Sequence, residues 1–219
     1  MGWANKLVGW TNNTGAEVNS LGSLYVVDVS PTGGNYVVAA KTGTIAAAAA
    51  AGAAVFVMRF DPAAGVKSVW VDSIKIRWTT VVAFTVPVTQ TRSIVITRGV
   101  GAAASGGTAL PTATKKDSNY ATSEFDASLG GDMRIASTGA LTVTGITFET
   151  VNLAEITLAQ VGAAGAFYEG IYEFSTRNHA IELHAGELIA IRVGASAMDA
   201  AGTWSLGVEA AWRESTTEA

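Results

Sequence analysis

Apolar side chains occupy every second position in many short segments of this chain. The clearest segment is TWSLGVEAAWR, whose apolar face would carry Trp204, Leu206, Val208, Ala210 and Trp212. Its other face would carry Ser205, Glu209 and Arg213. Because successive side chains of a β-strand point to opposite faces, this period of two indicates strands that pack one face on a core and turn the other toward solvent.

Similar alternation, or a compact run of β-branched and aromatic residues, recurs along the chain. The segments are SLYVVDV, NYVVAA, AVFVMRF, SIKIRW, TTVVAFTVPV, TRSIVIT, EITLAQV, AFYEGIYEF and GELIAIRV. Turn-forming sequences such as SPTGG, DPAAG, VGAAG and HAGE separate them. In LTVTGITFE the apolar parity changes at Gly145, which predicts a β-bulge or a bend. Strands at this spacing favour an all-β fold, and we expect a jelly-roll-like antiparallel β-sandwich.

The alanine-rich run IAAAAAAGAAVFVMRF could compete with this interpretation, because alanine favours helix. The run reaches Arg59 after about 14 residues, whereas a membrane helix needs about 20. Gly52 and the β-branched residues that follow it favour a loop that leads into a buried strand. The start, MGWANKLVGW, has one lysine and no continuous apolar stretch, so we expect neither a signal peptide nor a membrane partner.

Two stretches depart from the strand pattern. Residues 1–20 lack alternation and hold Trp3 and Trp10 among Asn, Thr and Gly, so we expect an extended N-terminal arm. The arm either packs on its own domain or reaches a neighbour, and in the second case Trp3 and Trp10 are the candidate partner contacts. Residues 21–219 are expected to form a single β-sandwich domain, interrupted by a long loop at about 99–132 that is rich in Gly, Ala, Ser and Thr.

The charge density of the chain is low. Only 15% of the residues are charged, against about 25% in ordinary soluble domains. We therefore expect part of the surface to be covered by other subunits. The formal net charge of -4 argues against nucleic acid as a partner, because phosphate binding requires a basic surface. The chain has 0 cysteines, which excludes disulfides, thiolate metal sites and thiol catalysis.

The segment NHAIELHAGELIAIRV holds both histidines of the chain, together with Glu182 and Glu187. His179 and His184 are five residues apart, so on a continuous strand they would point to opposite faces and could not bind one metal ion. The sequence HAGE lies where one alternating run gives way to the next. Because glycine tolerates the backbone of a tight connection, we expect a β-hairpin here and no metal site.

Other possible catalytic groups are no more convincing. Lys41-Thr42-Gly43 matches one box of the penicillin-recognising serine enzymes, but no Ser-x-x-Lys partner is present. GAAASGGT lacks the lysine of a phosphate-binding loop. Glu169 and Glu173 would share a strand face about 13 Å apart, beyond the roughly 5–10 Å of glycosidase carboxylate pairs. We therefore expect no catalytic residue, no cofactor and no metal, and hence no enzyme activity.

Several blocks taken in order resemble structural proteins of tailed bacteriophages and prophages. The blocks are AEVNSLGSLYVVDVSPTGGNYVVAAKTGT, AAVFVMRF, VWVDSIKIRWTTVVAFTVPV, ASGGTAL, GGDMRIASTGALTVTGITFET, HAGELIAIRV and TWSLGVEAAW. Together they span most of residues 16–213. The resemblance implies a virion component built on a jelly roll or similar β-sandwich, which decorates or cements the capsid or belongs to the tail or fibres. It brings no catalytic residues.

These observations lead to one main hypothesis. The chain would be a homo-oligomer, with a trimer favoured, made in the host bacterial cytoplasm and bound to the major capsid protein on the outside of a phage head. The first alternative is a tail-fibre or receptor-binding module that recognises host glycans. A second is a glycan depolymerase that uses Glu169 or Glu173, and a third is a plain carbohydrate-binding module.

Deleting residues 1–20 tests the role of the arm. We expect the β domain to stay folded, because the strand pattern lies outside the arm, while attachment to phage heads weakens. Circular dichroism reports the fold, and co-sedimentation with heads that lack the protein reports attachment. Unchanged occupancy after the deletion would count against anchoring by Trp3 and Trp10.

Overall fold

The computed structural model describes residues 34–45, 48–62, 68–84, 92–158, 167–173, 180–198 and 201–215, and the backbone of three short strands before them. The chain divides into two compact units, Met1–Ser30 and Pro31–Ala219. In the first unit, the described strands form a three-stranded antiparallel sheet of β1 (Leu7–Val8), β2 (Gly15–Val18) and β3 (Leu24–Tyr25).

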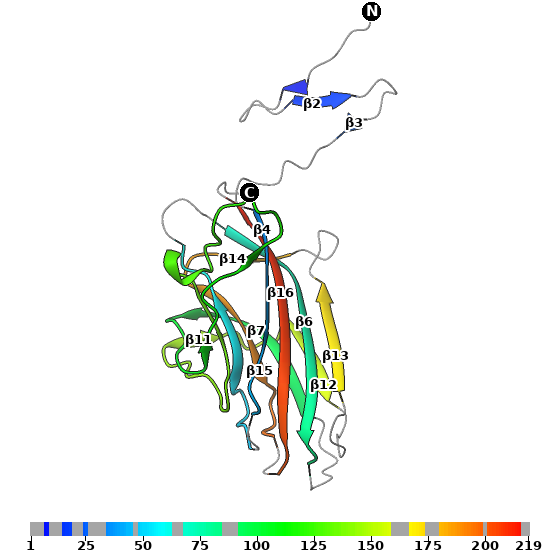
Figure 1. Cartoon of the computed structure of the whole chain (residues 1–219), viewed down its shortest axis with the longest axis vertical. Helices are drawn as coiled ribbons and strands as arrows, with labels where there is room; N and C mark the ends of the chain where they lie inside the picture. The colour runs from blue at the N-terminus through cyan, green and yellow to red at the C-terminus, as the bar shows by residue number, and fades with distance from the viewer. Residues whose placement is uncertain are drawn as a thin grey trace, which may run out of the picture. The chain divides into compact units, whose positions relative to one another are not determined.

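The described part of the second unit consists of two antiparallel sheets that pack as a sandwich (Figure 1). Sheet I has the order β11 (Ile146–Phe148), β7 (Arg92–Gly101), β15 (Glu187–Val193), β5 (Ala54–Arg59), β10 (Asp132–Ile135), β8 (Thr108–Ala109), and β12 (Ala154–Leu158) also pairs with β7. Sheet II has the order β13 (Phe167–Glu173), β6 (Ser68–Val82), β16 (Thr203–Ser215), β4 (Gly34–Lys41), β9 (Thr114–Lys115), and β14 (Ile181–Leu183) also pairs with β6.

The predicted all-β antiparallel sandwich is confirmed, while the jelly-roll strand order stays a prediction. The described residues include one short 3-10 helix, η1 (Ala127–Leu129), and no α-helix. In the alanine-rich run, the described residues before Ala54 form a bridge, a loop and a turn, as expected.

Strand β16 is the centre of sheet II, and its apolar face is the one expected from the sequence, although Ser205 on the opposite face is also buried. Its five predicted core residues are all buried: Trp204, Leu206, Val208, Ala210 and Trp212. Near one end of the strand, Trp204 stacks on Trp78 with ring centroids 4.2 Å apart. Near the other end, Trp212 stacks on Tyr36 at 5.9 Å and meets Phe125 edge to face at 5.0 Å. Aromatic packing therefore fixes both ends of β16.

The segment SIKIRW and the first four residues of TTVVAFTVPV, expected as separate strands, belong to one long strand, β6, which ends at Val82. Trp212 pairs with Val71 and Ala211 with Ser73, so Asp72 is an extra residue opposite β16. This β-bulge shifts the inward positions from Val71 to Ile74. It leaves both Asp72 and Ser73 partly exposed.

Strand β5 is covered on both faces. Val55, Phe56, Val57 and Met58 alternate in direction along the strand, yet each is 0% exposed. One face must pack on sheet II, and the other face needs a second cover. The long irregular segment after β7 provides part of this cover.

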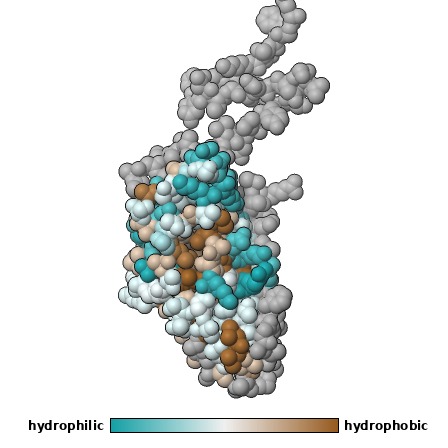
Figure 2. All heavy atoms as spheres, viewed as in Figure 1, coloured by the Kyte–Doolittle hydropathy of each residue, from teal (hydrophilic) through white to brown (hydrophobic). Residues whose placement is uncertain are grey.

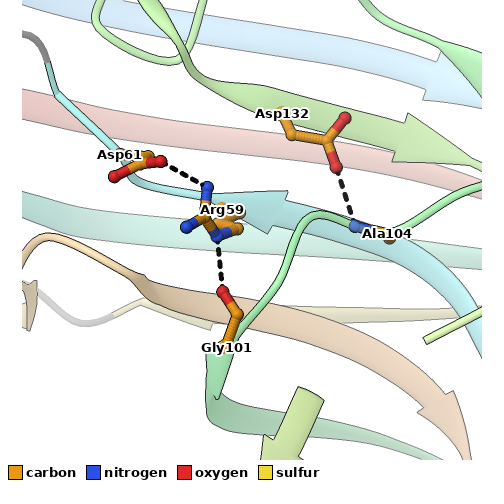
Figure 3. Close-up of polar contacts among 5 residues, drawn as sticks. All are labelled: Arg59, Asp61, Gly101, Ala104 and Asp132. Atoms are coloured by element: carbon orange, nitrogen blue, oxygen red, sulfur yellow. Dashed lines mark hydrogen bonds and ion pairs between the residues drawn. The ribbon is translucent and has the colours of Figure 1, made fainter. Parts of the chain in front are cut away.

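Arg59 on β5 holds the start of that segment in place (Figure 3). Its Nε donates to the carbonyl of Gly101 at 2.7 Å, and its Nη1 pairs with Asp61 at 2.7 Å. On the adjacent β10, the Asp132 carboxylate accepts from the backbone N–H of Ala104 at 3.0 Å (Figure 3). These contacts fix residues 101–104 over the outer face of sheet I, within the stretch predicted as a long loop.

A second segment, residues 141–153, contains β11 and lies along the neighbouring part of sheet I, where β11 pairs with the end of β7. The guanidinium of Arg192 on β15 lies 4.0 Å from the centre of the Phe148 ring. Thr97 Oγ1 on β7 donates to Asn152 Oδ1 at 3.1 Å. Gly145, at the predicted change of parity, has a φ of +81° and precedes β11, so the expected bend is confirmed as a turn.

The hairpin predicted at HAGE is wrong, although the turn is present. Gly186 has a φ of +84°, as a tight connection requires. However, β14 pairs with β6 of sheet II, while β15 pairs with β5 and β7 of sheet I. The turn therefore connects the two sheets. Turn residues specify a reversal of the chain and not the strands with which its flanks pair.

Replacing Trp204 with Ala should destabilise the fold by about 3–5 kcal/mol, because it leaves a cavity beside Trp78 in a fully buried site. Urea denaturation measures the free energy of unfolding. Val82→Ala is the control, because Val82 is 53% exposed and should change stability by less than about 0.5 kcal/mol. Equal effects of the two changes would contradict the packing described for β16.

Candidate functional site

Of the four residues weighed as metal ligands and expected to form a turn, the structure describes Glu182, His184 and Glu187. Glu182 lies in β14, while His184 and Glu187 flank the turn between the sheets. The Glu187 carboxylate accepts from the backbone N–H of His184 at 2.8 Å, so it caps the turn. His179 lies outside the described residues. Within the described ranges no group of three or more His, Asp or Glu side chains could hold a metal ion.

The predicted partner contacts Trp3 and Trp10 also lie outside the described residues. The Lys41-Thr42-Gly43 sequence begins at the last residue of β4, and Thr42 is only 4% exposed. Its Oγ1 accepts from the backbone N–H of Leu206 at 2.9 Å. The threonine hydroxyl therefore serves the pairing of β4 with β16 and faces no open site.

Glu169 lies in an ion-pair cluster on the outer face of sheet II. Its carboxylate accepts from Arg77 Nε at 2.8 Å and lies 3.4 Å from Lys75 Nζ. The hydrogen bond from Arg77 is the main reason that the pKa of this carboxyl falls below its ordinary value. A general acid needs the opposite shift, so these contacts do not favour the glycosidase role. The side chain of Glu173 is not among those described.

The chain contains a buried carboxylate, Glu214, that the sequence pattern did not single out. Glu214 at the end of β16 is 1% exposed and accepts from Ser123 Oγ at 2.6 Å and Trp212 Nε1 at 2.9 Å. The backbone N–H of Glu124 donates to the same carboxylate at 3.1 Å. Burial raises the pKa of Glu214, and these hydrogen bonds oppose the rise.

The Glu214 contacts anchor the long segment to sheet II. Phe125, next to the two residues that bind Glu214, packs between Trp212 and Phe60. Nearby, Tyr36 donates its hydroxyl to the carbonyl of Ala121 at 3.1 Å. A raised pKa can mark a catalytic group, but this carboxylate already accepts three kinds of donor in a packed site. We assign it a structural role.

Sheet II has a shallow depression of about 320 Å³ on its surface. Small residues, including Ala39 and Gly207, line it together with Lys75, Arg77 and Glu209. Figure 2 shows hydrophobic residues in separate patches on one face of the molecule, with hydrophilic residues between and beside them. The depression is open and carries both signs of charge, which suits contact with a broad surface.

A second depression, of about 460 Å³, lies where the segment 141–153 runs beside the end of β7, with which its strand β11 pairs. We call it the valine depression. Its apolar residues include Val100 and Val151, which are 51% and 74% exposed. Its charged residues are Arg98, Glu149 and Glu187. Arg98 Nε donates to Glu149 Oε1 at 2.6 Å.

One partly exposed indole lies on the outer side of sheet II. Trp70 stands between the buried residues Val69 and Val71, so its side chain points away from the core. In the register of the sheet, Glu182 and Arg213 flank it on the adjacent strands. An aromatic side chain beside polar groups is the feature expected for a sugar-binding surface.

No helix in the described part of the chain is long and apolar enough to cross a membrane. No protein-family model matches the chain, and no curated protein matches it. The functional conclusion therefore depends on the residues and surfaces themselves.

Glu214→Gln tests the buried carboxylate through pH. Because burial raises the pKa of Glu214 in the folded state, its contribution to stability is largest below the ordinary pKa of 4.5 and falls as pH rises through the folded-state pKa. The unfolding free energy of the wild type minus that of the variant should therefore decrease between about pH 4 and pH 7. Urea denaturation at several pH values measures this difference in unfolding free energy. A difference that stays constant or rises with pH would contradict a raised pKa for Glu214.

Proposed function

We propose that this chain is a structural protein of a tailed-bacteriophage virion. Its role would be that of a capsid decoration or cement protein, a jelly-roll-like homo-oligomer bound to the major capsid protein on the outside of the head. The chain would stabilise the head through protein–protein contacts, without catalysis. The sequence resemblance described above suggests this class.

The proposal rests mainly on the observation that many charged side chains pair with one another within the chain. Within the described part, six cations pair with carboxylates of the same chain: Arg59, Lys75, Arg77, Arg98, Arg134 and Arg213. A charge that is already paired loses less on leaving water than an isolated charge. A surface with few and internally paired charges is therefore suited to burial against other subunits.

The outer side of sheet II supports the same role. The small residues Ala39 and Gly207 let a neighbouring surface approach the strands closely, because neither projects a long side chain. The charged residues around them include both Lys75 and Glu209, so a partner can meet complementary charge. Such a surface fits a broad protein contact better than a small ligand.

A tail-fibre or receptor-binding module that recognises glycans is the second candidate. Trp70, flanked by Glu182 and Arg213, is the observation that favours it. Sugar rings can stack on an indole while their hydroxyls bind carboxylates and a guanidinium. Binding to host glycans that is lost in Trp70→Ala, with no affinity for heads, would favour this candidate over the first.

Quantitative mass spectrometry of purified virions tests the proposal. A decoration protein repeats over the capsid lattice, so we expect on the order of hundreds of copies per particle. A count from a few up to about fifty would indicate a tail or vertex position instead. Absence of the protein from purified particles would contradict the virion assignment altogether.

A further inference from the structure

The described part of the chain exposes two pairs of valines, and one pair lies in a depression. Val100 and Val151 line the valine depression and are 51% and 74% exposed. Val81 and Val82, at the end of β6, are 41% and 53% exposed and line neither depression described above. Exposed apolar residues gathered in a concave site indicate a contact surface more strongly than isolated ones.

The aromatic ring of this site already contacts a cation of the same chain. Phe148 lines the valine depression, but the guanidinium of Arg192 lies over its ring at 4.0 Å. Arg192 is held there because its Nε donates to the carbonyl of Gly52 at 2.9 Å. One face of Phe148 is therefore occupied, so a sugar ring could not stack on that face. The exposed valines that remain suit the apolar side chains of a protein.

The charges at the site are of both signs. Arg98 and Glu149 form an ion pair in which the side chains are 37% and 41% exposed. Glu187 lies in the same lining, with one carboxylate oxygen bound to the backbone of His184. A site that carries both a cation and additional acidic charge can complement itself when a second copy is turned to face it.

We propose that copies of this chain bind one another at the valine depression, around a closed rotation axis. Val100 and Val151 of one copy pack against the same surface of another, and Arg98 of each copy faces Glu187 of its neighbour. The inference deepens the proposed function and rests on it for the association of like subunits. It names a second copy of this chain as the occupant, and the residues through which that copy is held.

Sedimentation equilibrium of the full chain tests the apolar part of the contact. Val151→Glu places a carboxylate in the interface, and we expect it to weaken self-association at least about tenfold. Val82→Glu is the matched control, because it makes the same change at an exposed valine outside the site, and its association should equal that of the wild type. Circular dichroism establishes that both variants fold.

A mixing experiment tests the charged part. Arg98→Glu and Glu187→Arg should each weaken self-association, because each places like charges opposite one another. Mixed in equal amounts, the two variants should associate again, since the carboxylate introduced in one variant then meets the guanidinium introduced in the other. An additional variant, Glu187→Gln, removes the charge with little change of shape. Its amide oxygen can still accept from the His184 N–H, so this variant separates the loss of charge from the loss of the turn cap.

Three results would overturn the proposal: a wild-type chain that stays monomeric at high concentration, equal effects of the Val151 and Val82 changes, or no association on mixing. These outcomes are separable from failure of the proposed function. Association through the valine depression together with absence from virions would support the contact and contradict the virion function. Presence in virions together with a monomeric chain in solution would support the virion function and contradict the contact.

Discussion

The central constraint in this fold is that β5 buries both of its faces. One face of the strand packs against sheet II, and the other would expose Val55 and Val57 to water if nothing covered it. Residues 101–104, held by Arg59 and by Asp132, supply part of this cover. The position of this irregular stretch follows from the need to exclude water from sheet I.

This cover also determines where the surface remains apolar. The segment 141–153 packs on sheet I through Phe148, and at its junction with β7 it leaves Val100 and Val151 partly exposed. The two arginines described above, Arg59 and Arg192, are already paired or hydrogen-bonded within the chain. What is left for a partner is therefore shape, apolar area and a small number of complementary charges. These are the properties on which the proposed contact with other subunits rests.

The sequence alone predicted the elements that depend on local pattern. The alternation in β16 was correct because one face of that strand meets the core throughout. The buried position of Glu214 and the bulge at Asp72 were both readable in principle. Glu214 continues the parity of Trp212, and the apolar positions change parity between Val71 and Ile74. Neither residue was singled out, because Glu214 lies just beyond the strand segment TWSLGVEAAWR and Asp72 lies just before SIKIRW.

Other features could not be read from the chain because they depend on pairing between distant segments. The turn at Gly186 was evident, but its crossing from sheet II to sheet I depends on which strands its two flanks join. Likewise, the valine depression brings residues near 98–100 together with residues 147–151 and Glu187. No local pattern records that proximity. The proposed contact site therefore became visible only in the fold.

Hydrogen–deuterium exchange, compared between the free protein and the protein on purified virions, tests the account most directly. Amides that become buried in a contact exchange more slowly. If the protein works by contact, residues 98–101 and 147–151 should gain protection on the particle relative to the protein diluted until it is monomeric, while the interior of β5 should be protected equally in both states. Identical exchange in the two states, or protection confined to other surfaces, would contradict the account.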